Sequence, residues 1–244
     1  MRAEILLQKL LARVRKAVED YDMIQEGDRI GVGVSGGKDS LALLYCLDTL
    51  KRFYPKKFDL VAITISHGNE GFDIPSLIDI YNSLGIQYHI EDTLISRIVF
   101  DVRNEKNPCS LCSNMKRGAV HNTAKKIGCN KVAFAHHRDD VIETLLLSLF
   151  YEGRIHTFSP VTYLDRTGIT LIRPFIYTEE KMIRSFINKK GIRPIASGCR
   201  ADGKTKRRYI KDLTASLMEE NKHLKDNLFG AIQRSGINGW HPPR

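Results

Sequence analysis

The chain has 244 residues, of which 42% are hydrophobic and 27% are charged, and its formal net charge is +10. This length suffices for one large domain, or for a domain with a smaller appendage. The composition excludes a membrane-spanning chain, because no apolar run approaches the length needed to cross a bilayer. Since no signal-peptide pattern follows Met1, we expect a cytoplasmic protein.

Hydrophobic periodicity predicts helices and strands that alternate along most of the chain. The first element is an amphipathic helix over residues 3–21. Buried strands are then predicted at residues 30–34, 60–65, 86–90 and 131–135, and helices at residues 40–51, 75–84, 113–127 and 139–151. A hairpin follows over residues 161–175 with its turn at 165–168, and the chain ends in helical stretches at residues 178–191 and 205–235.

This alternation predicts an α/β fold, a doubly wound and mostly parallel sheet with helices on both faces. We expect an N-terminal helical segment (1–25), an α/β domain (26–178) and a basic, mainly helical C-terminal region (179–244). Residues 181–211 of that region carry eleven Lys or Arg against one acid, Asp202. Such a cluster is either a solvated face or a polyanion site, so RNA and DNA are candidate partners.

Two common nucleotide-binding motifs are excluded around the first strand. Gly31, Gly33 and Gly36 match the G-x-G-x-x-G fingerprint, but the first two fall inside the predicted strand. The second predicted strand also ends without the acidic residue that binds a ribose. The Walker pattern fails because Lys38 is followed by an aspartate rather than by Ser or Thr.

The motif that remains joins the first strand to the next helix and consists of Ser35, Gly36, Gly37, Lys38, Asp39 and Ser40. Its two glycines let backbone N–H groups approach an anion closely, and the helix N-terminus attracts negative charge. Lys38 adds a positive charge, whereas Asp39 would repel a phosphate unless a divalent cation lay between them. The loop therefore predicts a pyrophosphate site with Mg²⁺ at Asp39.

This loop resembles the PP-loop of the N-type ATP pyrophosphatases, which cleave ATP to AMP and pyrophosphate. Residues 135–144 resemble the second motif of that superfamily, although taken alone this His-His-x-Asp-Asp cluster would more often be a helix cap. Because ligands bind at the carboxyl ends of parallel strands, both motifs are expected to face one crevice. The resemblance implies an adenine nucleotide alpha hydrolase-like fold, with further contacts to ATP and Mg²⁺ from His136, Asp139 and Asp140.

The chain has five cysteines, an odd number that makes a disulfide framework unexpected and favours metal or redox use. Cys109 and Cys112 form a CxxC motif where a loop is expected to enter a helix, and by itself this motif fits a redox pair, half a zinc site or an iron–sulfur anchor. Cys199 is a distant third thiol. Cys129 is about 22 Å along the predicted helix, and Cys46 is expected in the core, so neither is a predicted ligand. Three thiolates suit a [4Fe–4S] cluster with one open iron, although zinc with a histidine as fourth ligand stays an alternative.

Over nearly its whole length the chain resembles the tRNA 2-thiocytidine synthetases, the TtcA family. The matching stretches are residues 23–30, the CxxC motif with Lys116 and Arg117, residues 136–140, residues 172–175 and the Cys199 loop. The resemblance implies a cytoplasmic homodimer that uses ATP, Mg²⁺ and a [4Fe–4S] cluster on a cytidine of the tRNA anticodon loop. The Cys199 loop departs from the family's Pro-Cys-x-x-Cys-Gly-Ser form.

These features predict an ATP-dependent tRNA sulfurtransferase. The cytidine O2 would attack the α-phosphate of ATP, and sulfide from a cysteine desulfurase or from solution would then displace AMP. Catalytic roles are expected for Lys38, Asp39, Asp139, Cys109, Cys112 and Cys199, of which the three cysteines would hold the cluster. The basic C-terminal region, Lys116 and Arg117 would bind the RNA.

Three alternatives remain open from the sequence. The first is a PP-loop ligase of the lysidine synthetase kind, which would need no cluster. The second is a sulfurtransferase that acts on another base or on a small molecule. The third is an RNA-binding module without catalysis, against which the intact Lys38, Asp39 and Asp139 argue.

Overall fold

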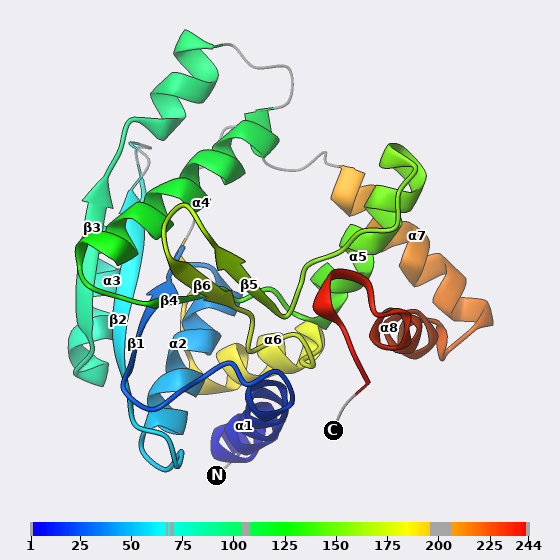
Figure 1. The fold of residues 1–244 in the computed structure, drawn as a ribbon, viewed down its shortest axis with the longest axis horizontal. Helices are drawn as coiled ribbons and strands as arrows, with labels where there is room; N and C mark the ends of the chain where they lie inside the picture. The colour runs from blue at the N-terminus through cyan, green and yellow to red at the C-terminus, as the bar shows by residue number, and fades with distance from the viewer. Residues whose placement is uncertain (1, 67, 69–70, 104–107, 196–205, 243–244) are drawn as a thin grey trace.

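The computed structural model describes residues 2–66, 68, 71–103, 108–195 and 206–242. A six-stranded sheet lies at its centre, in the order β3-β2-β1-β4-β6-β5 (Figure 1). Neighbouring strands are parallel except for the antiparallel pair β5 and β6. The strands are β1 (Asp28–Gly33), β2 (Phe58–Ser66), β3 (Gln87–Asp92), β4 (Lys131–Ala133), β5 (Val161–Leu164) and β6 (Ile169–Ile172).

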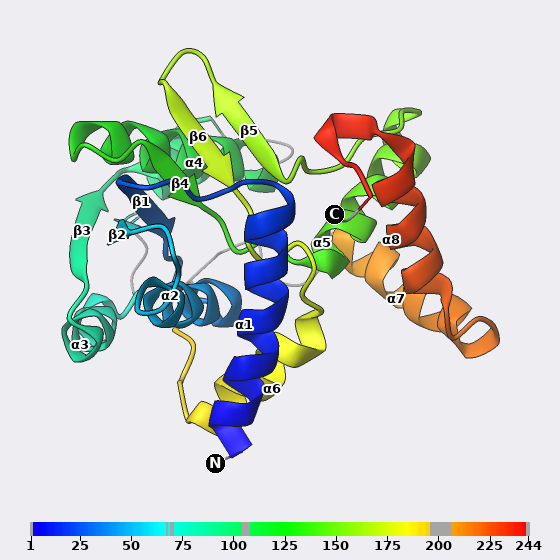
Figure 2. The same cartoon turned by 60° about the horizontal axis from the view of Figure 1, so that its bottom comes forward.

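Helices cover both faces of the sheet, as the alternating pattern predicts. In Figure 2, α1, α2 and α6 lie on one side and α4 lies on the other. The long helices are α1 (Arg2–Asp20), α2 (Lys38–Lys51), α3 (Ile74–Leu84), α4 (Pro108–Lys126), α5 (Arg138–Leu147), α6 (Glu180–Lys190), α7 (Lys206–Glu220) and α8 (Leu224–Ser235). Three short turns complete the described elements: η1 (Arg97–Val102), η2 (Ser148–Glu152) and η3 (Ile237–Gly239).

Strand alternation divides the interior into two hydrophobic cores. Ile30 and Val32 of β1 point into the larger core, which α1, α2, α6 and α8 also fill. Gly31 and Gly33 point to the smaller core on the α4 side, where there is no room for larger side chains. A Cβ atom on Gly31 would lie 2.6 Å from Ile63 Cδ1, and one on Gly33 would lie 2.9 Å from the Phe134 ring. These glycines thus serve strand packing, which agrees with the exclusion of the dinucleotide fingerprint.

The strand order places a crevice where the two predicted motifs meet. After β3 the chain crosses to the other side of β1, so β1 and β4 are neighbours whose following helices leave in different directions. This is the switch point of a doubly wound sheet, where ligands bind at the carboxyl ends of the strands. Residues 34–37 follow β1 and residues 134–137 follow β4, so both segments open onto this point.

The largest differences from the predicted boundaries concern three helical segments. Helix α4 begins at Pro108, five residues earlier than expected, because proline fits the first turn of a helix. Helix α5 ends at Leu147 and continues as the π-turn η2. The predicted helical stretch 205–235 is two helices, with a break at which the Asn221 side chain accepts a hydrogen bond from the His223 N–H.

The C-terminal helices α7 and α8 lie beside α5, away from the sheet (Figure 1). Neither they nor any other helix among the described residues combines the length and apolar character that crossing a membrane requires. Cys199 and the nearby basic residues Arg200 and Lys204 lie outside the described residues.

Candidate active site

The loop between β1 and α2 is held in one shape by glycine and serine contacts. Gly36 has φ +80°, a left-handed conformation, and a Cβ atom there would lie 3.0 Å from the Cβ of Ile195. The Ser40 hydroxyl donates to the Gly37 carbonyl oxygen at 2.9 Å and accepts from the Ser35 N–H at 3.2 Å. Helix α2 then begins at Lys38, and its first N–H groups have no acceptor within the helix, so the loop has the form of an anion site.

Two carboxylates hold the ammonium group of Lys38. Its Nζ atom lies 2.8 Å from Asp39 Oδ2 and 3.0 Å from Glu180 Oε1. Burial by itself would lower the pKa of Lys38, but the two carboxylates outweigh it and raise that pKa. Burial would raise the pKa of Glu180, but Lys211, Lys38 and Arg184 hold it far below its ordinary value. Lys38 therefore stays charged at the mouth of the phosphate loop.

Asp39 has one oxygen to spare. Its Oδ1 atom is buried and has no hydrogen-bond partner among the described residues, with His137 Nε2 at 3.9 Å. A buried carboxylate oxygen without a partner is costly. A divalent cation beside a bound phosphate would satisfy it, so the donor chemistry at Asp39 fits Mg²⁺.

The second motif caps helix α5. His137 Nδ1 accepts the N–H of Asp140 at 3.3 Å, and Asp140 Oδ2 accepts the N–H of His137 at 3.0 Å, which makes a reciprocal cap. The cluster is thus a helix cap, and Asp140 also lines the cavity described below, whereas contacts of the cluster to ATP and Mg²⁺ stay a prediction.

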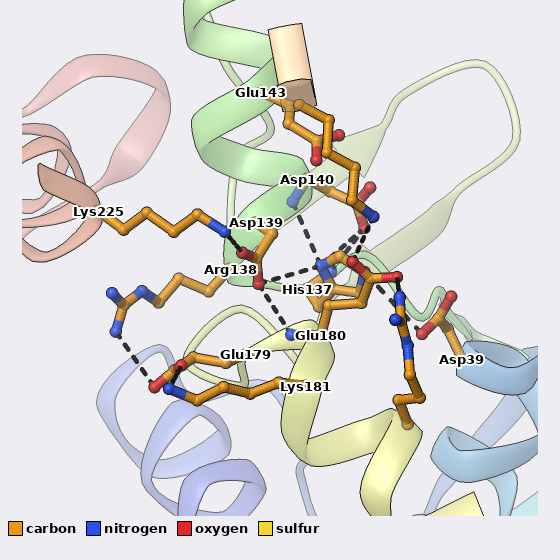
Figure 3. Close-up of polar contacts among 12 residues, drawn as sticks. Asp39, His137, Arg138, Asp139, Asp140, Glu143, Glu179, Glu180, Lys181 and Lys225 are labelled. Atoms are coloured by element: carbon orange, nitrogen blue, oxygen red, sulfur yellow. Dashed lines mark hydrogen bonds and ion pairs between the residues drawn. The ribbon is translucent and has the colours of Figure 1, made fainter. Parts of the chain in front are cut away.

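Asp139 forms contacts with residues of α6 and α8 (Figure 3). Its carboxylate pairs with Lys225 of α8 at 2.5 Å and accepts the N–H of Glu180 at 2.8 Å. Burial would raise the pKa of Asp139, but these two donors outweigh it and lower that pKa. Asp139 is absent from the described cavity lining, so the structure brings Asp39 and Asp140 to the cavity and places Asp139 behind them.

A cavity of about 480 Å³ joins the phosphate loop to the CxxC motif. Ser35, Asp39 and Ser40 line one end, and Cys109 and Cys112 of α4 line the other. Its apolar wall is formed by Ile63, Ile65, Phe100, Val120 and Phe134. A cavity of this size, with a few polar groups on apolar walls, suits a nucleoside-sized ligand.

The two cysteines lie in the first two turns of α4, three residues apart on one side of the helix. Cys109 is exposed and Cys112 is partly exposed, whereas Cys46 and Cys129 are buried in the two cores, as expected for non-ligands. Within the described part of the chain, no three His, Cys, Asp or Glu side chains are arranged as a metal site. Two accessible thiols on one cavity wall fit a shared iron–sulfur cluster, for which Cys199 is the predicted third ligand.

His136 forms part of the cavity wall between these two ends. Its ring stacks on Phe158 with the centroids 4.2 Å apart, and its Nδ1 atom is buried with no partner among the described residues. Burial, followed by the positive charges of Arg173 and Arg207, lowers the pKa of His136 well below its ordinary value. The side chain is therefore a neutral imidazole at neutral pH.

The C-terminal helices contribute residues that were not predicted from the sequence. Arg207 of α7 lies 3.0 Å from Glu143 and 3.4 Å from Asp140, and Lys211 lies 2.5 Å from Glu180. Arg207 belongs to the basic stretch at residues 181–211, but nothing in the sequence of that stretch distinguishes it from its neighbours. Glu180 gave no signal, since an acidic residue in the first turn of a helix is common.

A comparison with protein families decides the classification of the chain. The model of the PP-loop domain family matches residues 6–217. The chain belongs to the PP-loop family.

Curated relatives of this PP-loop protein share one description. A tRNA-cytidine(32) 2-sulfurtransferase of Pelobacter propionicus is 40% identical over 235 residues, which cover 95% of this chain and 87% of the relative. A tRNA-cytidine(32) 2-sulfurtransferase of Geobacter metallireducens is 38% identical and covers 92% and 89% of the two chains. These matches confirm the predicted resemblance and the predicted class of enzyme.

Solved structures share the fold at lower identity. The U34-tRNA thiolase NcsA from Methanococcus maripaludis with its [4Fe-4S] cluster has a TM-score of 0.76, with 22% identity over 93% of this chain and 78% of that one. An NH3-dependent NAD synthetase from Campylobacter jejuni has a TM-score of 0.52 and 15% identity over 99% and 98% of the chains. These likenesses confirm the fold class.

Proposed function

We propose that this PP-loop protein is an ATP-dependent tRNA sulfurtransferase that converts an anticodon-loop cytidine to 2-thiocytidine. The observation that supports this proposal is that a single cavity is lined by Asp39 and Ser40 of the phosphate loop and by Cys109 and Cys112. Activation by ATP and delivery of sulfur can therefore act on one base without its leaving the site. The names of the curated relatives favour position 32 as the target.

In the first step the phosphate loop binds ATP through the N–H groups at the start of α2 and through Lys38. Asp39, with its spare oxygen, would hold Mg²⁺, which neutralises phosphate charge during the reaction. The cytidine O2 attacks the α-phosphorus, the bond to the β-phosphate oxygen breaks, and pyrophosphate leaves. Lys38 stabilises the charge that develops on the phosphates.

In the second step sulfur attacks C2 of the adenylated base, and the C2–O bond breaks as AMP leaves. Cys109, Cys112 and Cys199 would hold a [4Fe–4S] cluster, which would supply sulfide-binding chemistry at an iron without a protein ligand. The apolar wall around Phe134 excludes water from the activated base, which limits hydrolysis back to cytidine.

Reconstitution tests the proposal directly. Protein prepared without oxygen and incubated with ATP, Mg²⁺, sulfide and unmodified tRNA should form 2-thiocytidine, detected by mass spectrometry of the digested nucleosides. An iron and sulfide assay on the same preparation should find a cluster. A colourless, iron-free protein that forms AMP from ATP but makes no 2-thiocytidine would instead support a ligase of the lysidine synthetase kind.

Replacing Asp39 tests the chemistry assigned to the phosphate loop. Asp39→Ala should lower AMP formation by about 100-fold or more, because the residue proposed to hold the metal at the phosphates is lost. Binding of tRNA, measured by filter retention, should stay within about twofold of wild type because Asp39 is not proposed to contact RNA. Unchanged modification activity would place the catalytic centre elsewhere.

A further inference from the structure

A group of arginine, histidine and aromatic side chains lies beside the cavity, between α4 and the ends of β4 and β6. It consists of Arg117, His121, His136 and Arg173, together with the rings of Phe134 and Phe158. The His121 and Phe134 rings are 5.9 Å apart, and those of Phe134 and His136 are 5.8 Å apart. On the far side of His136, the Arg173 guanidinium carbon lies 5.4 Å from the centroid of the Phe158 ring.

Three polar atoms in this group have no hydrogen-bond partner among the described residues. They are His121 Nε2, His136 Nδ1 and Arg173 Nε, and all three are buried. Arg173 is the most enclosed, with 6% of its surface exposed. Its Nη1 atom donates to the Ser159 carbonyl oxygen at 2.6 Å, which leaves the Nε–H unused. A buried donor without an acceptor carries a free-energy cost that a bound ligand can remove.

The charges of the group have one sign. Burial, and then the positive charge of Arg117, lowers the pKa of Arg173 to about 10, so the guanidinium stays charged at neutral pH. Burial and the same two arginines lower the pKa of His121. Within the described part of the chain neither Arg117 nor Arg173 forms an ion pair with a carboxylate. The two guanidinium groups repel each other, and a bound anion would relieve this repulsion.

Arg117 brings this charge to the cavity wall, which the neutral imidazole of His136 also lines. Arg117 and His121 are four residues apart on α4 and therefore share one side of the helix. The phosphate loop belongs to other elements, the end of β1 and the start of α2, so Arg117 and Arg173 provide positive charge in addition to that of Lys38. Arginine is the side chain best suited to bind a phosphate group.

We propose that Arg117 and His136, with the buried charge of Arg173 behind them, form a second phosphate site that binds a backbone phosphate of the target nucleotide. The inference rests on the proposed function, because a base that enters the cavity must bring its own phosphodiester to the cavity wall. A phosphate at Arg117 would fix the depth at which the base lies between Asp39 and Cys112. The site would thus position the cytidine O2 for adenylation.

Arg117 is exposed, so its replacement should not disturb folding. Arg117→Ala should weaken tRNA binding about 5- to 10-fold and reduce the slope of log affinity against log salt by about 0.7 to 0.9, as expected for one lost phosphate contact. Arg117→Lys keeps the charge and should retain the slope. The matched control is Lys125→Ala, which removes an exposed cation from the same helix two turns further on and should change neither quantity.

Two further measurements identify the source of the phosphate and protect against a folding defect. Affinity for ATP and for pyrophosphate should be the same in wild type, Arg117→Ala and Lys125→Ala. Inorganic phosphate should shift the ring NMR signals of His121 and His136 in wild type, and this shift should be lost in Arg117→Ala. Arg173→Met should weaken tRNA binding while the protein keeps a cooperative unfolding transition; if that variant fails to fold, the Arg117 variants still decide.

Different results would contradict the proposed function and the proposed phosphate site. If wild-type protein binds no tRNA, the proposed function falls. If wild type binds tRNA and Arg117→Ala binds it equally well with the same salt slope, the phosphate site alone is wrong. Weaker pyrophosphate binding in Arg117→Ala with unchanged tRNA binding would overturn the assignment to the RNA backbone.

Discussion

Glu180 is the residue that connects the phosphate loop to the C-terminal helices. Its carboxylate lies 3.0 Å from Lys38 Nζ and 2.5 Å from Lys211 Nζ, and its backbone N–H donates to Asp139. With its pKa held far below the ordinary value, Glu180 is charged at any pH at which the protein works. A partly buried lysine held by two carboxylates loses little motion when a phosphate binds, so Glu180 is expected to position Lys38.

Replacing Glu180 should separate turnover from ATP affinity. Glu180→Ala should slow AMP formation about 10-fold because Lys38 is less well positioned. Affinity for ATP should not weaken, since a negative charge near the phosphates is removed. Glu180→Gln keeps an oxygen that can accept a hydrogen bond from Lys38. Its rate of AMP formation should therefore lie between those of wild type and Glu180→Ala. Initial-rate kinetics and equilibrium ATP binding measure the two effects.

Glu179 provides the control for this experiment. It is the neighbouring residue and pairs with Lys181 and Arg138 rather than with Lys38. Glu179→Ala should therefore leave turnover near that of wild type. Equal effects of the two alanine variants, or a parallel loss of ATP affinity and thermal stability in Glu180→Ala, would argue against a positioning role.

At the scale of elements, Tyr81 ties helix α3 to the sheet. Its hydroxyl lies 2.6 Å from the Thr64 hydroxyl of β2, and Thr64 in turn donates to the Val34 carbonyl oxygen just before the phosphate loop. Burial raises the pKa of Tyr81 to about 12. The packing of α3 is thus coupled to the protonation of one tyrosine.

This coupling predicts a loss of stability at alkaline pH. Tyr81 has a higher pKa in the folded protein than the value of about 10 in the unfolded chain, so its contribution is complete below pH 10 and is lost as the pH rises toward 12. The free energy of unfolding should fall by roughly 2 kcal/mol over that interval from this residue. Urea titrations followed by circular dichroism at several pH values measure the slope.

The variant Tyr81→Phe isolates this contribution. At pH 8 it should lose about 1 kcal/mol, the net value of one hydrogen bond. Above pH 10 the stability of this variant should fall less steeply than that of wild type. Some fall should remain, because other tyrosines with a raised pKa, such as Tyr177, still contribute. Parallel curves for the two proteins would show that Tyr81 does not carry the alkaline transition.

At the scale of the whole molecule, Trp240 packs against residues from distant parts of the chain. Trp240 is buried, and its indole N–H donates to the Phe158 carbonyl oxygen at 2.8 Å. Its ring meets the edges of Tyr21, which follows α1, and of Phe229 in α8, with centroids 5.8 and 5.4 Å away. One residue near the end of the chain therefore joins the first helix, the last long helix and the loop that supports His136.

Trp240→Ala should lower the free energy of unfolding by about 3–5 kcal/mol, the usual cost of removing a large buried ring. It should also weaken tRNA binding, because α8 and α7 lose their anchor to the rest of the protein. Urea denaturation followed by circular dichroism measures the first effect. Tyr163→Ala, at a residue that is 61% exposed on β5, is the control and should change stability by less than about 1 kcal/mol. A comparable loss in both variants would refute the anchoring role.

Sequence motifs predicted the phosphate loop well because its geometry is local. Ser35 to Ser40 join one strand to the next helix, so residue order alone brings the glycines, Lys38 and Asp39 to one turn. The same locality let hydrophobic alternation predict the sheet and its helices. It also placed His136 and Asp140 at the same edge, because both motifs follow parallel strands that are neighbours in the sheet.

The sequence by itself thus determined the fold class, the PP-loop and the three-cysteine hypothesis, since each depends on residue types at short spacing. Tertiary structure decided which distant charges meet. Glu180 reaches Lys38, Lys225 reaches Asp139, and Arg173 lies near Arg117, although 56 to 142 positions separate the members of these pairs. Periodicity shows which face of a helix is buried but not which other element covers it. That is why the sequence located the groups proposed to react, whereas the packing of α6, α7, α8 and the hairpin revealed the side chains that contact them.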